Sequence, residues 1–257
     1  MSVTELPQPA QWRDKDFFAV AGIALFGASA VVAALWTLQR LERGEYVTAA
    51  ITAGGTVFSL CCALLAVRGR FMRTPLRAKV DSTGTKLLPD VVSVILVVVL
   101  CVAAIPSGVL FVVFAPQGRV DLPISDGERI FEPILIGALV FFAAVGLIAM
   151  VRRRGTGHLL LTPDGFELVD VLFTQRGSWD NIDDVSDLAA DKQVRHPVVL
   201  VMKDGKPVVI KNADGYAPNG AALYWLVRHY WLHPDNRVEL VDGRAVARLR
   251  DQDFVTE

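Results

Sequence analysis

The chain has 257 residues, of which 53% are hydrophobic, and its mean hydropathy is +0.41. This composition is too apolar for an ordinary soluble domain and fits a membrane protein with a soluble appendage. The charge is unevenly distributed, because residues 1–154 carry 15 basic and 11 acidic residues whereas residues 155–257 carry 11 and 16. An acidic soluble part has the wrong sign for nucleic acid, so we expect no nucleic-acid binding.

The first 16 residues are polar and contain Pro7 and Pro9, so we expect residues 1–16 to form a mobile N-terminal segment. Acidic and basic residues are mixed here, unlike the basic start of a signal peptide. The apolar run that follows is also too long for a signal-peptide core. We therefore expect this run to be an uncleaved first membrane span.

Four apolar runs predict four membrane-spanning helices within a membrane domain of residues 17–154. The runs cover residues 17–38, 46–67, 91–115 and 133–151. A helix needs about 20 such residues to cross the hydrocarbon core, and all four runs are near or above that length. No ionisable residue lies within the core of a run, which argues against pumps and proton relays, because these use intramembrane charges.

Basic residues gather in the segment 68–86 and at the end of the last apolar run. They are Arg68, Arg70, Arg73, Arg77, Lys79, Lys86, Arg152, Arg153 and Arg154. The other two connections hold few basic residues, and acids dilute them. The positive-inside rule then predicts a multi-pass protein of the cell membrane with both termini in the cytoplasm. The same basic residues are candidate contacts for anionic membrane lipids, although fixing the topology would by itself explain them.

One face of the second predicted span carries small and hydroxyl side chains. Thr48, Thr52 and Thr56 recur every four residues, with Gly55 and Ser59 close by. Such side chains let helices approach closely in lipid. The stripe is compatible with a compact four-helix bundle within one chain or with a seam between copies in a homo-oligomer. A polar permeation path is the functional alternative.

Residues 155–257 are numerous enough for one cytoplasmic domain with its own core. Alternating or apolar runs, separated by turn signals such as Asp204-Gly205, predict short β-strands. These runs cover residues 158–162, 166–173, 174–179, 182–188, 197–202 and 207–211. Residues 218–232 then place Leu223 and Val227 on one face of a helix, and a helical tail follows. The fold class expected for this part is α+β.

This arrangement of six short strands closed by an amphipathic helix resembles the bacterial pleckstrin-homology (PH)-like domains. The string LLLTPDGFEL, which begins at Leu159, is similar to their opening hairpin, and Trp179 and Ile182 are similar to the end of a following strand. The tail from Trp225 to Leu240 resembles that of actinobacterial multi-span membrane proteins that carry such a domain. The resemblance implies a small β-barrel or sandwich closed by a C-terminal helix, and it implies no catalytic residues.

Core and metal-site candidates follow from the same part of the chain. Trp179 and Ile182 are expected to form the core together with the helix residues Leu223 and Val227. His229 and His233 lie four residues apart, but Tyr230 stands where a zincin carries glutamate. The aspartates at positions 180, 183, 184 and 187 lack the glycine and glutamate of an EF-hand. We therefore expect neither a metal nor another cofactor.

The sequence contains no phosphate-binding loop, nucleophile elbow or dinucleotide fingerprint. It predicts a non-enzymatic integral membrane protein that presents a cytoplasmic PH-like domain to a protein partner. Such a protein would serve as a scaffold or accessory subunit of a membrane complex. The alternative is a transport component for a lipid or small molecule that acts as an oligomer.

Overall fold

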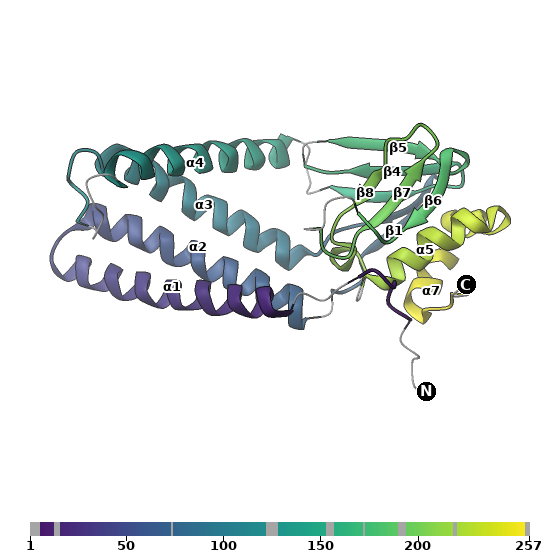
Figure 1. Ribbon diagram of the computed structural model, residues 1–257, viewed down its shortest axis with the longest axis horizontal. Coiled ribbons are helices and arrows are strands. Elements are labelled where there is room, and N and C mark those ends of the chain that lie inside the picture. Colours follow the sequence, from purple (N-terminus) through teal and green to yellow (C-terminus); the bar gives the residue numbers. More distant parts are fainter. Residues whose placement is uncertain are drawn as a thin grey trace. The chain divides into compact units, whose positions relative to one another are not determined.

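The computed structural model describes residues 6–12, 16–72, 74–121, 128–152, 157–171, 173–189, 194–217 and 220–254. The chain divides into two compact units that alternate along the sequence (Figure 1). The helical unit comprises residues 15–71 and 91–155. The soluble unit comprises residues 1–14, 72–90 and 156–257.

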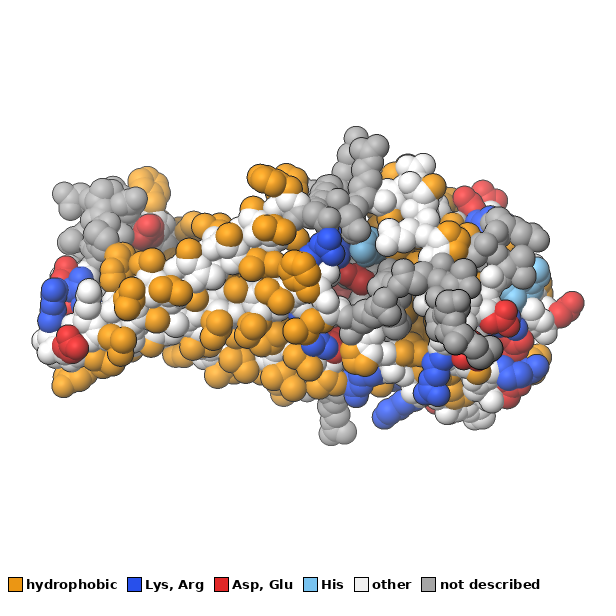
Figure 2. All heavy atoms as spheres, turned by 90° about the horizontal axis from the view of Figure 1, so that it is seen from below, with side chains coloured by type: hydrophobic (Ala, Val, Ile, Leu, Met, Phe, Trp, Pro, Cys, Tyr) orange, Lys and Arg blue, Asp and Glu red, His pale blue; other side chains and the backbone are white. Residues whose placement is uncertain are grey.

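The helical unit contains four long apolar helices, as the sequence predicts. They are α1 (Asp16–Glu42), α2 (Tyr46–Phe71), α3 (Val91–Phe114) and α4 (Glu128–Arg152). All four are long and apolar enough to cross a membrane. Apolar side chains cover the visible face of these helices, and charged side chains are sparse along them (Figure 2). An apolar surface of this extent suits lipid and not water.

The four helices pack in chain order, α1 on α2, α2 on α3, and α3 on α4 (Figure 1). Among the described residues no comparable packing joins α4 to α1, so the helices form a row and the expected compact four-helix bundle is not seen. Glycines set the closest approaches. A Cβ atom at Gly54 would overlap Ser107 of α3, and one at Gly108 would overlap Val140 of α4. Small residues thus bring α3 close to both neighbours.

The soluble unit contains two antiparallel sheets. The first has the order β1 (Ala78–Asp81), β2 (Gly84–Leu87), β3 (His158–Leu161), β4 (Gly165–Val169) and β5 (Thr174–Ser178). The second has the order β6 (Ile182–Ser186), β7 (Val198–Met202) and β8 (Val208–Ile210). Within the described ranges no strand pairing joins the two sheets into a closed barrel.

Helices complete the soluble unit. The main one is α5 (Ala221–Leu232), followed by the short α6 (Glu239–Asp242) and α7 (Arg244–Asp251). Single turns of 3-10 helix cover Trp179–Asn181, Ala213–Gly215 and Pro234–Val238. The predicted strands after residue 157, the amphipathic helix and the helical tail are thus all present, with ends that differ by a few residues.

The β1–β2 hairpin corrects the predicted domain boundary. It lies between α2 and α3 in sequence, where we expected a connection of the membrane domain. However, β2 pairs with β3, and it places the buried Leu87 opposite the buried Leu159. The hydroxyl of Thr85 also donates a hydrogen bond of 2.6 Å to the carbonyl oxygen of Leu240 in α6. The hairpin therefore belongs to the soluble unit, because its inner face is part of that unit's core.

The N-terminal segment requires a second correction. Residues 6–12 belong to the soluble unit and are not a free segment there, since Trp12 and Pro9 are buried. We call residues 6–12 the N-terminal strap. The rest of the predicted mobile segment before α1, residues 1–5 and 13–15, lies outside the described residues.

One hydrophobic core joins the sheets and helices of the soluble unit. Trp179 is 1% exposed, and Ile182, Leu223 and Val227 are buried in the same core. The indole nitrogen of Trp179 donates a 2.8 Å hydrogen bond to the carbonyl oxygen of Thr162, which satisfies its polar atom. Its ring meets Phe166 edge to face, and the guanidinium of Arg237 lies 5.4 Å from its centre.

Candidate functional site

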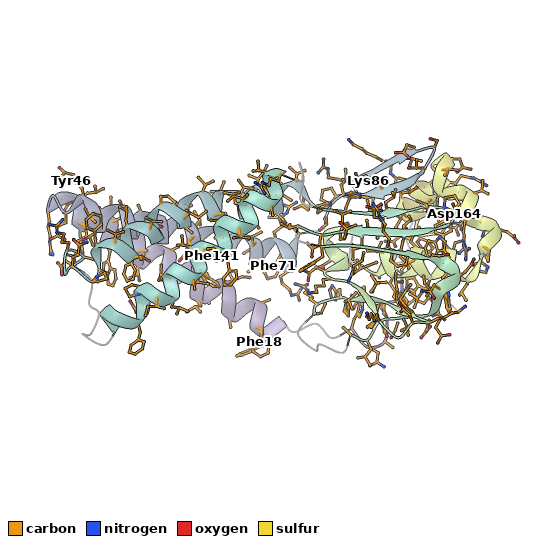
Figure 3. The ribbon with its side chains drawn as sticks, turned by 90° about the horizontal axis from the view of Figure 1, so that it is seen from above. Phe18, Tyr46, Phe71, Lys86, Phe141 and Asp164 are labelled. Carbon is orange, nitrogen blue, oxygen red and sulfur yellow. The ribbon has the colours of Figure 1, made fainter. Side chains whose placement is uncertain are left out.

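Some of the basic residues predicted to face lipid lie at helix ends. Arg68 and Arg70 lie in the last turn of α2, and Arg152 lies in the last turn of α4. The other end of α2 carries the exposed Tyr46 (Figure 3). Arginine and tyrosine at helix ends suit the two interfaces of a membrane. Three more of these residues lie outside the described part of the chain, namely Arg73, Arg153 and Arg154.

The remaining predicted basic residues lie in or beside the hairpin of the soluble unit. Arg77 precedes β1, and its Nη1 donates to the carbonyl oxygen of Pro89 at 3.4 Å. Lys86 lies on β2 (Figure 3), and Lys79 is directly opposite it on β1. Like charges in this arrangement repel. Burial, and then the charge of Lys86, lower the pKa of His158 on the adjacent β3. The basic segment 68–86 is thus divided between the two units.

The hydroxyl stripe of α2 takes part in packing inside the helical unit. Thr48, Thr52 and Ser59 are buried, and the hydroxyl of Thr37 on α1 donates to the hydroxyl of Thr52 at 2.9 Å. The hydroxyl of Thr56 donates to the carbonyl oxygen of Thr52 at 2.9 Å. These bonds give each of the donating hydroxyls an acceptor within the helices.

The predicted role of Gly55 in helix packing is not seen within the chain. A Cβ atom at Gly55 would meet no neighbour within 4 Å, whereas one at Gly54 would overlap Ser107. Consecutive helix residues point about 100° apart, so Gly54 and Gly55 cannot both face α3. The glycine that lets α2 and α3 approach each other is therefore Gly54.

The histidines and acidic residues of the C-terminal region form a structural network. Glu239 accepts two hydrogen bonds from Arg248, at 2.8 and 3.0 Å, and one of 3.0 Å from the hydroxyl of Tyr230. Arg248 is the main reason that the pKa of Glu239 is lowered. Burial, then the charges of Arg248 and His233, lower the pKa of His229. In the described part of the chain, no three His, Cys, Asp or Glu residues are grouped so as to hold a metal ion.

The most developed surface site, which sequence reasoning missed, receives the N-terminal strap. The indole of Trp12 stacks on His196 with ring centroids 4.7 Å apart and an interplanar angle of 21°, and it meets Tyr224 of α5 edge to face. Its Nε1 donates a 3.1 Å hydrogen bond to the carbonyl oxygen of Pro197, immediately before β7. The tryptophan side chain is therefore buried against two rings and a polar acceptor and is part of the hydrophobic core of the soluble unit.

The backbone of the strap is also recognised. The indole Nε1 of Trp225 donates to the carbonyl oxygen of Pro7 at 2.9 Å. The amide of Gln11 donates to Oδ2 of Asp187 at 2.9 Å, just beyond β6. We call the surface that makes these contacts the strap site. It consists of Asp187, His196, Pro197, Tyr224 and Trp225.

Bonds that do not involve the strap hold the walls of the strap site. The hydroxyl of Tyr224 donates to the carbonyl oxygen of Val185 at 3.3 Å, and burial is the main cause that raises the pKa of this tyrosine. His196 has a left-handed backbone (φ 42°), and its carbonyl oxygen accepts the amide of Ala213 at 3.1 Å. The site is therefore shaped by β6, β7 and α5, which lie far from the strap in sequence.

Comparison with known proteins assigns no family to the chain. No family model, no curated protein and no solved structure matches it.

Proposed function

We propose that the chain is an integral protein of the cell membrane whose soluble unit is a PH-like domain that binds a protein partner. In this role the protein is a scaffold or accessory subunit of a membrane complex. The strap site carries the proposal, because it is a surface of the soluble unit that already holds a peptide segment through side-chain and backbone contacts.

The order of elements supports the PH-like part of the proposal. Strands β3 to β8 are six short antiparallel strands, and the amphipathic α5 follows them. The hairpin β1–β2 adds two strands to the first sheet from a distant part of the chain. In a PH-like domain of this kind, α3 and α4 would be an insertion between two neighbouring strands of one sheet.

The order of the elements along the chain also indicates which helix ends lie on the same side of the membrane. The strap precedes α1, the hairpin lies between α2 and α3, and β3 follows α4, yet all three segments fold into one soluble unit. A folded soluble unit lies on one side of a bilayer, so both termini share that side. The positive bias at Arg68, Arg70 and Arg152 favours the cytoplasm, where each charge near anionic lipid contributes about 1 kcal/mol.

Site-directed photo-crosslinking in cells tests the interaction. In a Trp12→Ala variant, whose strap is weakened, a photoreactive residue at Leu188, which is exposed and next to Asp187, should give a discrete adduct with another protein. The control position is Arg176, which is exposed on β5 of the other sheet and should not give this adduct. Adducts with lipid alone, or equal protein adducts from both positions, would contradict an interaction role for this surface.

Cysteine labelling tests the topology separately. A cysteine at Lys79 on β1 should react only with reagents that reach the cytoplasm, whereas one at Gln117, just after α3, should react from outside. Labelling of both positions from the same side would contradict the proposed topology.

A further inference from the structure

We infer that the strap site is a docking site for a partner segment with the pattern Pro-x-Pro-x-x-Trp, which the chain's own strap occupies in the resting state and which turns between its second proline and its tryptophan. In the strap this pattern is Pro7, Pro9 and Trp12. The inference rests on the proposed interaction role, and it names the chemistry of the partner segment and what that segment must displace.

The contacts at the strap site are those of peptide recognition. One side chain, Trp12, anchors in an aromatic pocket, and buried aromatic anchors commonly dominate binding energy. Two bonds are made to the main chain, at the carbonyl oxygen of Pro7 and the amide of Gln11. Each proline fixes its own φ angle in the free segment and so lowers the entropy that is lost on binding.

The indole N–H of Trp225 has a particular role in this arrangement. It donates to the carbonyl oxygen of a proline, which has no N–H of its own with which to pair. Aromatic grooves that bind proline-rich segments use the same combination of ring surface and donor. The site therefore recognises the main chain at this position, and the proline there limits the backbone conformations of the free segment.

The strap can leave without removing any wall of the site. The contacts to the strap come from Asp187, His196, Pro197, Tyr224 and Trp225, and other bonds of this region, such as that from Tyr224 to Val185, do not involve the strap. The tethered strap nevertheless has a high local concentration, on the order of millimolar for a short linker. A free segment should thus compete poorly until the strap is weakened.

The test uses the full-length protein in detergent and a fluorescein-labelled peptide with the strap sequence LPQPAQW. Fluorescence polarisation should show that Trp12→Ala protein binds this peptide at least about tenfold more tightly than wild-type protein does, because its own anchor is gone. A peptide in which alanine replaces the tryptophan should bind the Trp12→Ala protein at least about tenfold more weakly than LPQPAQW.

A matched variant tests the role of the indole donor. Trp12→Ala/Trp225→Phe keeps an aromatic ring on α5 and removes only the N–H, and it should bind LPQPAQW several-fold more weakly than Trp12→Ala alone. Unchanged binding would overturn the assignment of main-chain recognition at Pro7 to Trp225.

A Trp12→Ala protein that retains its thermal unfolding transition but does not bind the peptide would overturn the inference. If this variant does not fold, a protease site inserted between Trp12 and Asp16 replaces it, and the cut strap should exchange with labelled peptide. A cut strap that never exchanges would show that it is a fixed part of the core. Exchange of straps between two differently labelled copies would instead assign the site to a second copy of this chain.

The peptide-binding and photo-crosslinking experiments can fail independently, so failure of this inference can be told from failure of the proposed function. Peptide binding without a protein adduct at Leu188 would retain the docking chemistry and contradict the interaction role in cells. A protein adduct that excess LPQPAQW leaves unchanged would retain the interaction role and overturn the partner pattern.

Discussion

The substitution Leu87→Ala tests most directly whether the β1–β2 hairpin belongs to the soluble unit. Leu87 lies in β2, between two membrane helices in sequence, but its side chain is fully buried in the core of the soluble unit opposite Leu159. Removal of a buried leucine side chain costs about 2–5 kcal/mol, because transfer free energy is lost and a cavity remains. We expect a cost in the upper half of this range, since both neighbouring strands and α6 hold the backbone in place.

Hydrogen exchange followed by mass spectrometry on the full-length protein in detergent measures this effect. A loss of 2–5 kcal/mol in the free energy of opening speeds exchange about 30-fold to a few thousand-fold, since 1.4 kcal/mol corresponds to a factor of ten. The faster exchange should appear in β3 and β4, which lie more than 70 residues from the substitution.

Val80→Ala is the matched control, because Val80 lies on β1 of the same hairpin but is 37% exposed. It should change exchange in β3 by much less than Leu87→Ala does. If Leu87→Ala altered exchange only within the hairpin, or only in α2 and α3, the assignment of the hairpin to the soluble unit would be refuted.

Three further predictions concern other parts of the chain. Trp179→Ala should destabilise the soluble unit by about 3–5 kcal/mol in urea titrations, whereas Trp179→Phe should cost much less because it retains ring packing against Phe166; equal losses would contradict this packing. Burial lowers the pKa of His229 in the folded state, so stability should be complete above about pH 6.5 and fall as the unfolded chain takes up this proton at lower pH. His229→Gln should flatten that fall, and an unchanged slope would contradict the linkage. In the helical unit, Gly54→Ala should lower the thermal stability in detergent through overlap with Ser107, by about 1–3 kcal/mol, while Gly55→Ala should leave it nearly unchanged.

Local patterns in the sequence were sufficient for most of the elements. Uninterrupted apolar length predicts α1 to α4, and turn signals between β-type runs predict β3 to β8. These signals depend on neighbouring residues alone, so one sequence is enough to detect them. The burial of Trp179 was also predictable from its neighbours, because a large aromatic side chain between two polar turns is expected to pack into the core.

The hairpin and the strap depend on distant partners, and this is why sequence reasoning missed them. Each strand of the hairpin has four residues, and its outward lysines give it the composition of a charged connection. The strap has the proline content of a mobile segment, and Trp12 is the single local signal that it is anchored. Neither pattern contains information about which distant surface will pair with it.

Because β2 pairs with β3, the first sheet cannot be completed until β3 has been synthesised. Roughly 70 residues, which include α3 and α4, separate these two strands. At a translation rate of about 5–20 residues per second, the hairpin waits roughly 4–14 s for its partner strand to leave the ribosome. During that interval Leu87 and the edge of β2 are uncovered and open to non-native pairing. The final sheet can form only after both later helices have been made, so an error in their insertion would also leave the hairpin unpaired.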